Sequence, residues 1–419
     1  MKQEPIAIVL GGTYPHISLI KKLKKRGYKI LLVDYAENPI AKEFADEHIL
    51  ESSMDREKVL EISKKYNVDL VITTCSDQAN VTACYVAEKL GLPAPYSYEV
   101  ALSVTDKEIM KKKMIENDIP TSSFHIIDKN WKMSEFENLN YPIIVKPTDG
   151  YGSKGVRVAN NADELAENIP LAIRESQKGF VIVEEYIVGT EIGIDCFVKE
   201  GKAHVVMTKH RHKIHDSKNE IEQIFGCTWP AVLSPELQTK IKKITNDIAR
   251  AFSLKNTPLM IQAIVRENEI YVIEFGARIG GGNSYNIIKR HTGFDIIEAS
   301  INSFLGIPVE IELIDNPFFY ADVFLYMESS VFGYVANINE LIDKKIAEDV
   351  LLTKKEGVLI GGDLASRNRI GSIILKADSL EQLFSKMSKA VSLVEIYDSQ
   401  NNPRFRRELY KRIDDLLES

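Results

Sequence analysis

The chain of 419 residues is 44% hydrophobic and 27% charged, which is typical of soluble globular proteins, and its length predicts roughly two to four domains. The formal net charge of −7 argues against a general nucleic-acid-binding surface, and four scattered cysteines without CxxC spacing argue against a disulfide framework or structural zinc. No apolar run approaches the roughly 20 residues that span a bilayer, and the polar start does not resemble a signal peptide. We therefore expect a cytoplasmic protein with no nucleic-acid or membrane partner.

The N-terminal part alternates short apolar runs with amphipathic stretches. We expect strands at 6–10, 29–33 and 69–74, and helices at 15–26, 54–66 and 78–90. This alternation predicts a parallel sheet with helices on both faces, which is a Rossmann-like α/β domain. Ligands on such sheets bind beyond the carboxyl ends of the strands, so Gly11, Gly12, Thr13 and the segment 73–78 are candidate substrate contacts.

Gly11 and Gly12, followed by Asp34, also invite a dinucleotide-binding interpretation. The fingerprint is incomplete, because its third glycine is missing and Ile17 or Ser18 stands there. A tight strand-to-helix turn also requires glycines, so Gly11 and Gly12 have two open interpretations, a structural role in the turn and substrate binding.

A proline-rich linker at 92–95 precedes an expected helix at 100–117. This helix has Asp106 and Lys107 near its start and a basic cluster at 111–113. The cluster is most simply a solvated helix face.

A strand, a lysine, a glycine-rich loop and a second strand make up 141–158. Lys146 follows three β-formers, and the loop 149–155 contains three glycines that let backbone N–H groups approach a ligand. A lysine facing such a loop suits a polyphosphate, although an ordinary hairpin remains an equal alternative. It is neither a Walker loop nor a GxGxxG turn, because both of those open a helix.

The middle of the chain predicts helices at 162–176, 234–252 and 287–305, a strand at 180–184, and two hairpins at 192–207 and 258–275. The segment 209–215, KHRHKIH, is dense in cations and imidazoles. Solvated loop charge explains it, and a metal site is disfavoured. After residue 308 we expect strands at 318–326, 358–361 and 372–376 and helices at 380–394 and 404–418, which form an α/β lobe.

In their order and spacing, the lysine and glycine loop at 146–155, the segment 184–187 and the segment 274–282 resemble the ATP-grasp superfamily. The branch is that of the carboxylate–amine ligases, which includes biotin carboxylase, glycinamide ribonucleotide synthetase and the amino-acid ligases. The resemblance covers essentially the whole chain. It implies a Rossmann-like pre-ATP-grasp domain at 1–105, a two-lobed ATP-grasp domain at 106–312 with an ATP lid at about 120–188, and a C-terminal α/β lobe at 313–419.

The same resemblance implies ATP as cosubstrate and Mg²⁺ as the cation, with Mn²⁺ as an alternative. Lys107 and Lys146 would contact the phosphates, and Glu191 would bind the ribose. The hinge begins at Glu184, and the backbone of Glu185 and Ile187 would bond the adenine edge. A lid over the triphosphate would contain Gly152, Ser153 and Gly155. The segment 209–215 would border the substrate pocket as a cationic wall.

The metal site departs from the family pattern, which has an acid on one strand and an E-x-N-x-R motif on the next. Glu274 and Arg278 match the second element, but Gly276 replaces its asparagine and Gln262 replaces the first acid. We expect Gln262 and Glu274 to hold the metal, with a cross-strand polar pair as the alternative. Arg278 would clamp the transferring phosphoryl group and contact the substrate, together with the next glycines, Gly280 and Gly281.

The resemblance thus implies an ATP-dependent carboxylate–amine ligase that forms an amide through an acyl phosphate and releases ADP and phosphate. Its partners would be a small carboxylate, such as an amino acid, and an amine, with a homodimer as one candidate assembly. A purine-pathway ligase such as phosphoribosylglycinamide synthetase is one alternative. A catalytically degenerate ATP-binding protein is the other, and Gln262 and Gly276 favour it.

Overall fold

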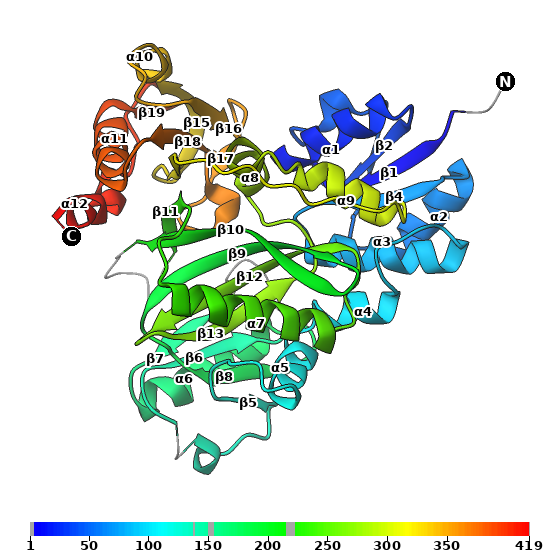
Figure 1. Ribbon diagram of the computed structural model, residues 1–419. Coiled ribbons are helices and arrows are strands. Elements are labelled where there is room, and N and C mark those ends of the chain that lie inside the picture. Colours follow the sequence, from blue (N-terminus) through cyan, green and yellow to red (C-terminus); the bar gives the residue numbers. More distant parts are fainter. Residues whose placement is uncertain (1–3, 137–138, 150–154, 215–222, 419) are drawn as a thin grey trace.

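The computed structural model describes residues 4–136, 139–149, 155–214 and 223–418. In Figure 1 the N-terminal α/β domain lies at the upper right and the C-terminal lobe at the upper left, the green strands of a central antiparallel sheet lie below them, and a small four-stranded sheet lies at the bottom. None of the helices in the described part of the chain combines the length and the apolar character that crossing a bilayer requires.

The N-terminal domain contains a parallel sheet of order β3-β2-β1-β4, as expected from the alternation of apolar runs and amphipathic stretches. Its strands are β1 (Ile6–Leu10), β2 (Lys29–Asp34), β3 (Glu47–Leu50) and β4 (Leu70–Thr73). Helix α1 (Tyr14–Lys25) connects β1 to β2, helix α2 (Arg56–Tyr66) connects β3 to β4, and helix α3 (Asp77–Leu90) follows β4. Strand β3 was not expected.

Two short helices, α4 (Tyr98–Ser103) and α5 (Lys107–Glu116), replace the single helix expected at 100–117. The break occurs because the Asp106 side chain accepts hydrogen bonds from the backbone N–H groups of Glu108 and Ile109 and so starts a new helix.

A four-stranded antiparallel sheet of order β5-β8-β6-β7 follows, and we call it the lid. Its strands are β5 (Phe124–Ile127), β6 (Ile143–Pro147), β7 (Arg157–Ala159) and β8 (Val181–Glu185). Helix α6 (Ala162–Glu175) packs on β6 and β7 and buries Leu165 and Ile169 against Val145 and Val183. The lid therefore has a hydrophobic core of its own.

The central sheet has eight strands in the order β13-β12-β9-β10-β11-β14-β18-β16. The first five positions are filled by β13 (Glu269–Gly276), β12 (Thr257–Arg266), β9 (Thr190–Lys199), β10 (Lys202–Lys213) and β11 (Ile224–Trp229). The other three are β14 (Phe319–Leu325), β18 (Gly371–Ala377) and β16 (Asp349–Leu352), which come from the expected C-terminal lobe. The sheet therefore passes without a break through the boundary expected after residue 312.

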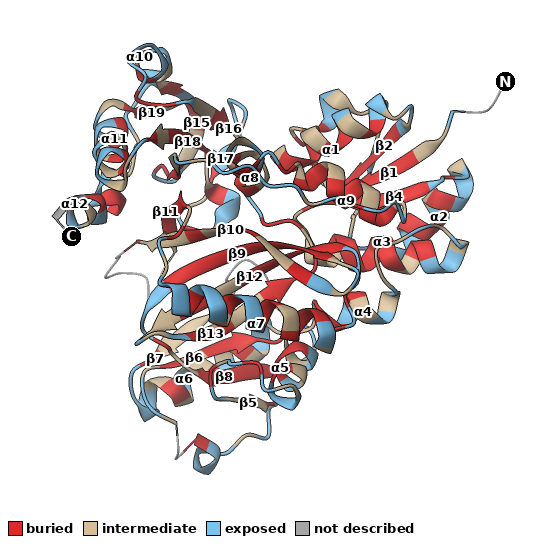
Figure 2. Cartoon of the chain, viewed as in Figure 1, coloured by how far each residue is buried: buried red, intermediate tan, exposed pale blue. Residues whose placement is uncertain are grey.

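Helices cover this sheet and bury its central strands (Figure 2). The long helix α7 (Pro235–Ala251) packs against β10 and β13. Instead of one helix at 287–305 the chain forms α8 (Ser284–Thr292) and α9 (Ile296–Phe304), because Gly293 adopts a left-handed conformation (φ +74°) that ends α8.

The rest of the C-terminal lobe is a small sheet of order β17-β15-β19 with helices beside it. Its elements are β15 (Ser330–Ala336), β17 (Leu359–Ile360), β19 (Glu395–Asp398), α10 (Ile338–Asp343), α11 (Leu380–Leu393) and α12 (Arg412–Glu418). Short 3-10 helices lie at Lys42–Phe44, Met133–Phe136, Ser366–Asn368 and Arg407–Tyr410. The helix expected at 404–418 therefore begins only at Arg412.

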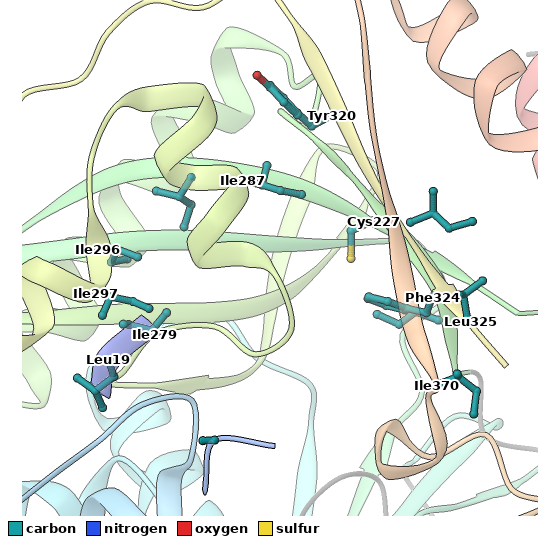
Figure 3. Packing of buried hydrophobic residues seen from close by; sticks show 14 of the residues in the cluster. Leu19, Cys227, Ile279, Ile287, Ile296, Ile297, Tyr320, Phe324, Leu325 and Ile370 are labelled. Carbon is teal, nitrogen blue, oxygen red and sulfur yellow. The ribbon is translucent and has the colours of Figure 1, made fainter. Parts of the chain in front are cut away.

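One hydrophobic core joins the N-terminal domain to the C-terminal lobe. It runs from Leu19 in α1 through Ile296 in α9 to Phe324 in β14 (Figure 3). Two ion-pair contacts reinforce the same boundary: Lys22 Nζ lies 2.6 Å from Asp295 Oδ2, and Arg26 pairs with Glu298. The N-terminal domain is thus fixed against α9.

Candidate functional site

Two lysines and one glutamate form a buried charge cluster where the lid meets α5. Lys146, near the end of β6, pairs with Oε1 of Glu184, and Lys111 Nζ lies 2.9 Å from Oε2 of the same carboxylate. Ser122 donates a further hydrogen bond to Oε2 over 2.8 Å. The three charged side chains are at most 7% exposed as whole residues, so they depend on one another for charge compensation.

Electrostatics within the cluster favour the charged carboxylate. Burial alone would raise the pKa of the Glu184 carboxyl, but the positive charges and hydrogen bonds of Lys111 and Lys146 hold that pKa well below its usual range. Burial, with a smaller contribution from Lys146, lowers the pKa of Lys111 against the attraction of Glu184. Two ammonium groups beside one carboxylate leave one excess positive charge, which suits a phosphate.

This cluster corrects the sequence interpretation of residues 111–113. Lys111 is 2% exposed and lies beside the buried Met110 and Met114, so it is not part of a solvated helix face. Lys112 and Lys113 do lie outward on α5. Lys107 is the first residue of α5, about one turn before Lys111.

Gln262 and Glu274 face each other across strands β12 and β13. Directly opposed residues point to the same face of a sheet, so the two side chains are neighbours. Neither side chain forms a hydrogen bond or an ion pair with the described residues. If the two side chains formed only a cross-strand polar pair, a hydrogen bond between them would be expected.

The donor set of this pair fits Mg²⁺. The ion prefers oxygen ligands and takes few of them from protein when phosphates supply the rest, and one carboxylate with one amide oxygen meets that need. No group of three or more His, Cys, Asp or Glu side chains is placed to hold a metal ion anywhere in the described ranges.

The segment after β8 contains a buried backbone donor, Ile187. The N–H of Glu185 donates to the carbonyl of Ser123 over 3.0 Å, and the N–H of Tyr186 donates to the carbonyl of Pro142 over 3.0 Å. The N–H of the buried Ile187 makes no hydrogen bond to the part of the chain that is described. An adenine edge would satisfy it.

Glu191, the expected ribose ligand, is paired with cations of β10. Its Oε1 accepts a hydrogen bond from Arg211 Nε over 2.5 Å, and Lys213 Nζ lies 3.8 Å from Oε2. A carboxylate held in this way keeps lone pairs for vicinal hydroxyls.

The segment 209–213 is strand, not loop, which corrects the alternative of solvated charge. Lys209, Arg211 and Lys213 share one face, and Lys209 Nζ lies 2.9 Å from the buried Asp195 Oδ2. His212, on the other face, stacks on Phe225. His215, the last residue of the motif, lies outside the described residues.

Arg278 is held by an acidic residue from the N-terminal domain. Its Nε and Nη2 donate to the two oxygens of Asp77 over 2.9 and 2.7 Å, and Nη1 donates to the carbonyl of Ile279 over 2.9 Å. A guanidinium has five N–H donors, so one remains on each Nη. Bidentate contact with a phosphoryl group through these two donors remains geometrically open.

Gly280 and Gly281, which were both expected to contact the substrate, differ in the space around their Cα atoms. A Cβ on Gly280 would lie 2.9 Å from Asp195 Oδ1, so this glycine is needed for packing, whereas a Cβ on Gly281 would meet nothing within 4 Å. In the lid loop, Gly155 has a left-handed φ of +75°. Gly152 and Ser153 lie outside the described residues.

The Gly11–Thr13 loop is stabilised by contacts within the N-terminal domain. The N–H of Gly12 donates to Asp34 Oδ2 over 2.6 Å, and Thr13 Oγ1 lies 2.9 Å from Nδ1 of the buried His16. A Cβ on Gly11, which has a φ of +96°, would lie 3.1 Å from the His16 ring. Because the Asp34 carboxylate occupies the Gly12 N–H, this loop is poorly suited to an anionic ligand.

Residues 139–286 match the protein family described as ATP-grasp domain. This segment is an ATP-grasp domain. That is the family expected from the sequence, and the carboxylate–amine ligase branch is confirmed as well by the kinds of protein that this ATP-grasp chain resembles.

A phosphoribosylamine–glycine ligase from Pyrococcus furiosus is 26% identical over 307 residues, which are 68% of this chain and 68% of the relative. An L-amino acid ligase from Bacillus licheniformis superposes with a TM-score of 0.79 at 21% identity and covers 95% of this chain and 100% of its own. The biotin carboxylase domain dimer of 2-oxoglutarate carboxylase from Hydrogenobacter thermophilus was solved with MgADP and bicarbonate. It superposes with a TM-score of 0.74 at 17% identity, and the match covers 100% of this chain and 94% of its own. These two structural similarities establish the fold.

Sequence reasoning missed two polar residues of this site, Lys111 and Ser122, and named Asp77 only within the segment 73–78 of candidate substrate contacts, not as a partner of Arg278. Lys111 was recognisable from its position between Met110 and Met114, which marks the buried face of α5. Ser122 and Asp77 carried no local signal, because each acts on a residue of a distant segment.

Proposed function

We propose that this ATP-grasp ligase uses ATP and Mg²⁺ to join a small carboxylate, an amino acid or a similar acid, to an amine. One observation carries the proposal. The Glu274 carboxylate lies opposite Gln262 across β12 and β13 and has no hydrogen-bond or ion-pair partner among the described residues. The cations that its charge reaches, Lys111, Arg211 and Arg278, are each already paired with another acid. A carboxylate without such a partner, beside an amide oxygen, suits a metal ion that is also held by a polyphosphate.

The reaction has two displacement steps. A carboxylate oxygen of the acid forms a bond to the γ-phosphorus of ATP while the bond from that phosphorus to the β,γ-bridging oxygen breaks, and ADP leaves. The nitrogen of the neutral amine then bonds to the acyl carbon, and the carbon–oxygen bond to phosphate breaks. Inorganic phosphate leaves, and the proton lost by nitrogen passes to phosphate or water.

These steps ask the protein mainly for in-line positioning and charge neutralisation. Lys146 and Lys107 would contact the phosphates, Ile187 the adenine edge and Glu191 the ribose. Arg278 would hold the transferring phosphoryl group through its two remaining N–H donors.

Gln262 and Glu274 would hold Mg²⁺ together with phosphate oxygens, and the bound ion would neutralise charge on those oxygens. The fit of the two side chains and the MgADP in one structural neighbour support this assignment. Because Glu274 is the charged ligand of the pair, its loss should remove activity.

Phosphate release from ATP in the presence of pooled amino acids and pooled amines tests the function, with Glu274→Gln as the negative control. We expect release that requires both an acid and an amine and that is absent in the variant. Binding of ATP without release under any pairing would instead identify a catalytically degenerate ATP-binding protein.

A purine-pathway ligase is the second candidate, and the Pyrococcus relative favours it. That function requires a site for a phosphosugar amine. The Asp34 carboxylate at the Gly12 N–H disfavours such a site in the N-terminal loop. Glycine with phosphosugar amines should therefore support less phosphate release than pairs of free amino acids, and the reverse ranking would establish the second candidate.

A further inference from the structure

Asp77 is the first residue of α3, in the N-terminal domain, but its carboxylate is not the cap of that helix. The cap is Ser76, whose side chain accepts from the N–H of Ala79. The two oxygens of Asp77 instead reach across the domain boundary and accept from Nε and Nη2 of Arg278 over 2.9 and 2.7 Å. Pairing through two parallel hydrogen bonds fixes the plane of the guanidinium as well as its position.

Gly276 provides the space for this contact. A Cβ at residue 276 would lie 2.6 Å from Asp77 Oδ1 and 3.3 Å from Arg278 Nε. Gly276 ends strand β13 without a positive φ, so its backbone conformation does not require glycine. The space for Asp77 is therefore the physical reason for a glycine at this position.

A side chain at residue 276 would point to the face of the sheet that carries Gln262 and Glu274. Residues two apart on a strand point to the same face, so this space adjoins Glu274 and its cross-strand neighbour Gln262. The Asp77 carboxylate thus lies in line with the pair that fits Mg²⁺.

We propose that Asp77 is the positioning residue for Arg278 and that the N-terminal domain thereby completes the phosphoryl-transfer site; the proposal rests on the function proposed above. Asp77 holds the Nε/Nη2 edge of Arg278, and one N–H on each Nη is directed to the transferring phosphoryl group. Gly276 leaves the space that the Asp77 carboxylate occupies in this arrangement.

A simple docking role for the ion pair makes a different prediction. The N-terminal domain is already fixed by the shared core and by the pairs of Lys22 and Arg26 with α9. Glu298→Gln weakens docking at a distance from the site and is therefore the matched control. If Asp77 served only docking, both variants would affect the enzyme in the same way.

The first measurement needs no turnover. The ratio of the dissociation constants for ADP and for a non-hydrolysable β,γ-imido analogue of ATP reports contact with the γ-phosphoryl group. Asp77→Ala, Asp77→Asn and Arg278→Ala should each lower the preference for the triphosphate, by about tenfold for the two alanine variants, while Glu298→Gln should not. A carboxylate that merely lay near the phosphates would repel them, so its removal would tighten triphosphate binding. Tighter or unchanged binding in Asp77→Ala overturns the proposal.

The second measurement is a double-mutant cycle. Gly276→Ala should lower kcat by about 100-fold in the wild-type background, because the new methyl displaces Asp77, and should cost little more in the Asp77→Ala background. Formate should restore part of the activity of Asp77→Ala. Additive effects of the two substitutions would show that Gly276 and Asp77 do not act together.

The two measurements separate the proposals. A wild-type protein without phosphate release refutes the proposed ligase activity. The triphosphate preference still decides the role of Asp77 in that case.

Discussion

Lys111 Nζ lies 2.9 Å from Glu184 Oε2, and this buried ion pair joins helix α5 to strand β8 of the lid. The other oxygen of Glu184 pairs with Lys146. The Glu184 carboxylate therefore holds Lys111 of α5 beside Lys146 of the lid. The position of the lid relative to α5 depends on all three side chains.

Lys111→Met should destabilise the protein by about 2 kcal/mol, because Oε2 of the buried Glu184 carboxylate loses a charge-assisted hydrogen bond, while Lys146 still compensates the charge of that carboxylate. Lys112→Met is the matched control: it removes the next lysine of α5, which is exposed and pairs only with Glu108 on the helix surface, and should change stability little. Urea denaturation of both variants checks the prediction. Equal effects would mean that the pair contributes nothing.

Lys146→Ala should weaken ATP binding by about 10–100-fold, the effect of losing one charge-assisted hydrogen bond. Isothermal titration calorimetry measures it, with the exposed lid residue Lys132 changed to alanine as the control. Unchanged affinity in a folded Lys146→Ala protein would exclude this lysine as a phosphate ligand.

Glu274→Gln should abolish substrate-dependent phosphate release while leaving thermal unfolding unchanged, since the Glu274 carboxylate has no partner among the described residues to lose. Gln262→Glu places two like charges opposite each other, so it should lower the melting temperature without metal and tighten nucleotide-dependent Mn²⁺ binding. Electron paramagnetic resonance of Mn²⁺ with ADP measures the second effect. A Glu274→Gln protein that turns over normally would mean that the metal is bound elsewhere.

Gly155→Ala should destabilise the lid by about 2 kcal/mol and weaken ATP binding. The new Cβ combines a left-handed φ of +75° with a contact of 2.8 Å to the ring of Pro147. Gly179→Ala isolates the backbone effect, because Gly179 has a φ of +74° with nothing within 4 Å of its Cβ, and should cost about 1 kcal/mol. Limited proteolysis of the lid and urea denaturation compare the two. If both variants lost the same free energy of unfolding, the contact with Pro147 would not contribute to the effect of Gly155→Ala.

Acidification should destabilise the N-terminal domain through His16. Burial lowers the pKa of this imidazole from 6.5 to about 4, so the unfolded chain binds a proton at a higher pH than the folded one. The stabilising effect is complete above pH 6.5 and is lost as the pH falls toward 4. Between pH 7 and 5.5 the wild type should lose about 1 kcal/mol more than His16→Asn. Urea denaturation at the two pH values tests this, and an identical loss in both proteins would contradict it.

The sequence predicts those parts of the fold that are encoded locally. The apolar runs of the N-terminal domain, the strand ending near Lys146 and the hairpin carrying Gln262 and Glu274 each have a periodicity or a turn signal of their own. The alternation of Lys209, Arg211 and Lys213 with His210 and His212 also contains the period of a strand. It was hidden because cationic residues are uncommon in strands unless acids such as Glu191 and Asp195 lie across from them.

Contacts between distant segments were not predictable in this way. The face of α5 that carries Met110 and Met114 marks Lys111 as the buried lysine of the three at 111–113, but nothing local indicates that Glu184 of the lid is its partner. Nothing near Asp77 indicates that it reaches Arg278, and the missing side chain at Gly276 is meaningful only once that contact is known.

The continuity of the central sheet determines where the chain can be divided. Strand β14 pairs with β11 in the antiparallel register Gly226↔Val323 to Trp229↔Tyr320, so a cut after residue 312 would leave β11 paired with β10 on one edge and unpaired on the other. An unprotected, apolar strand edge recruits strands from other molecules. A fragment containing only the ATP-grasp part would therefore aggregate, and exchanging C-terminal lobes between related ligases requires that β14 be kept with the ATP-grasp part.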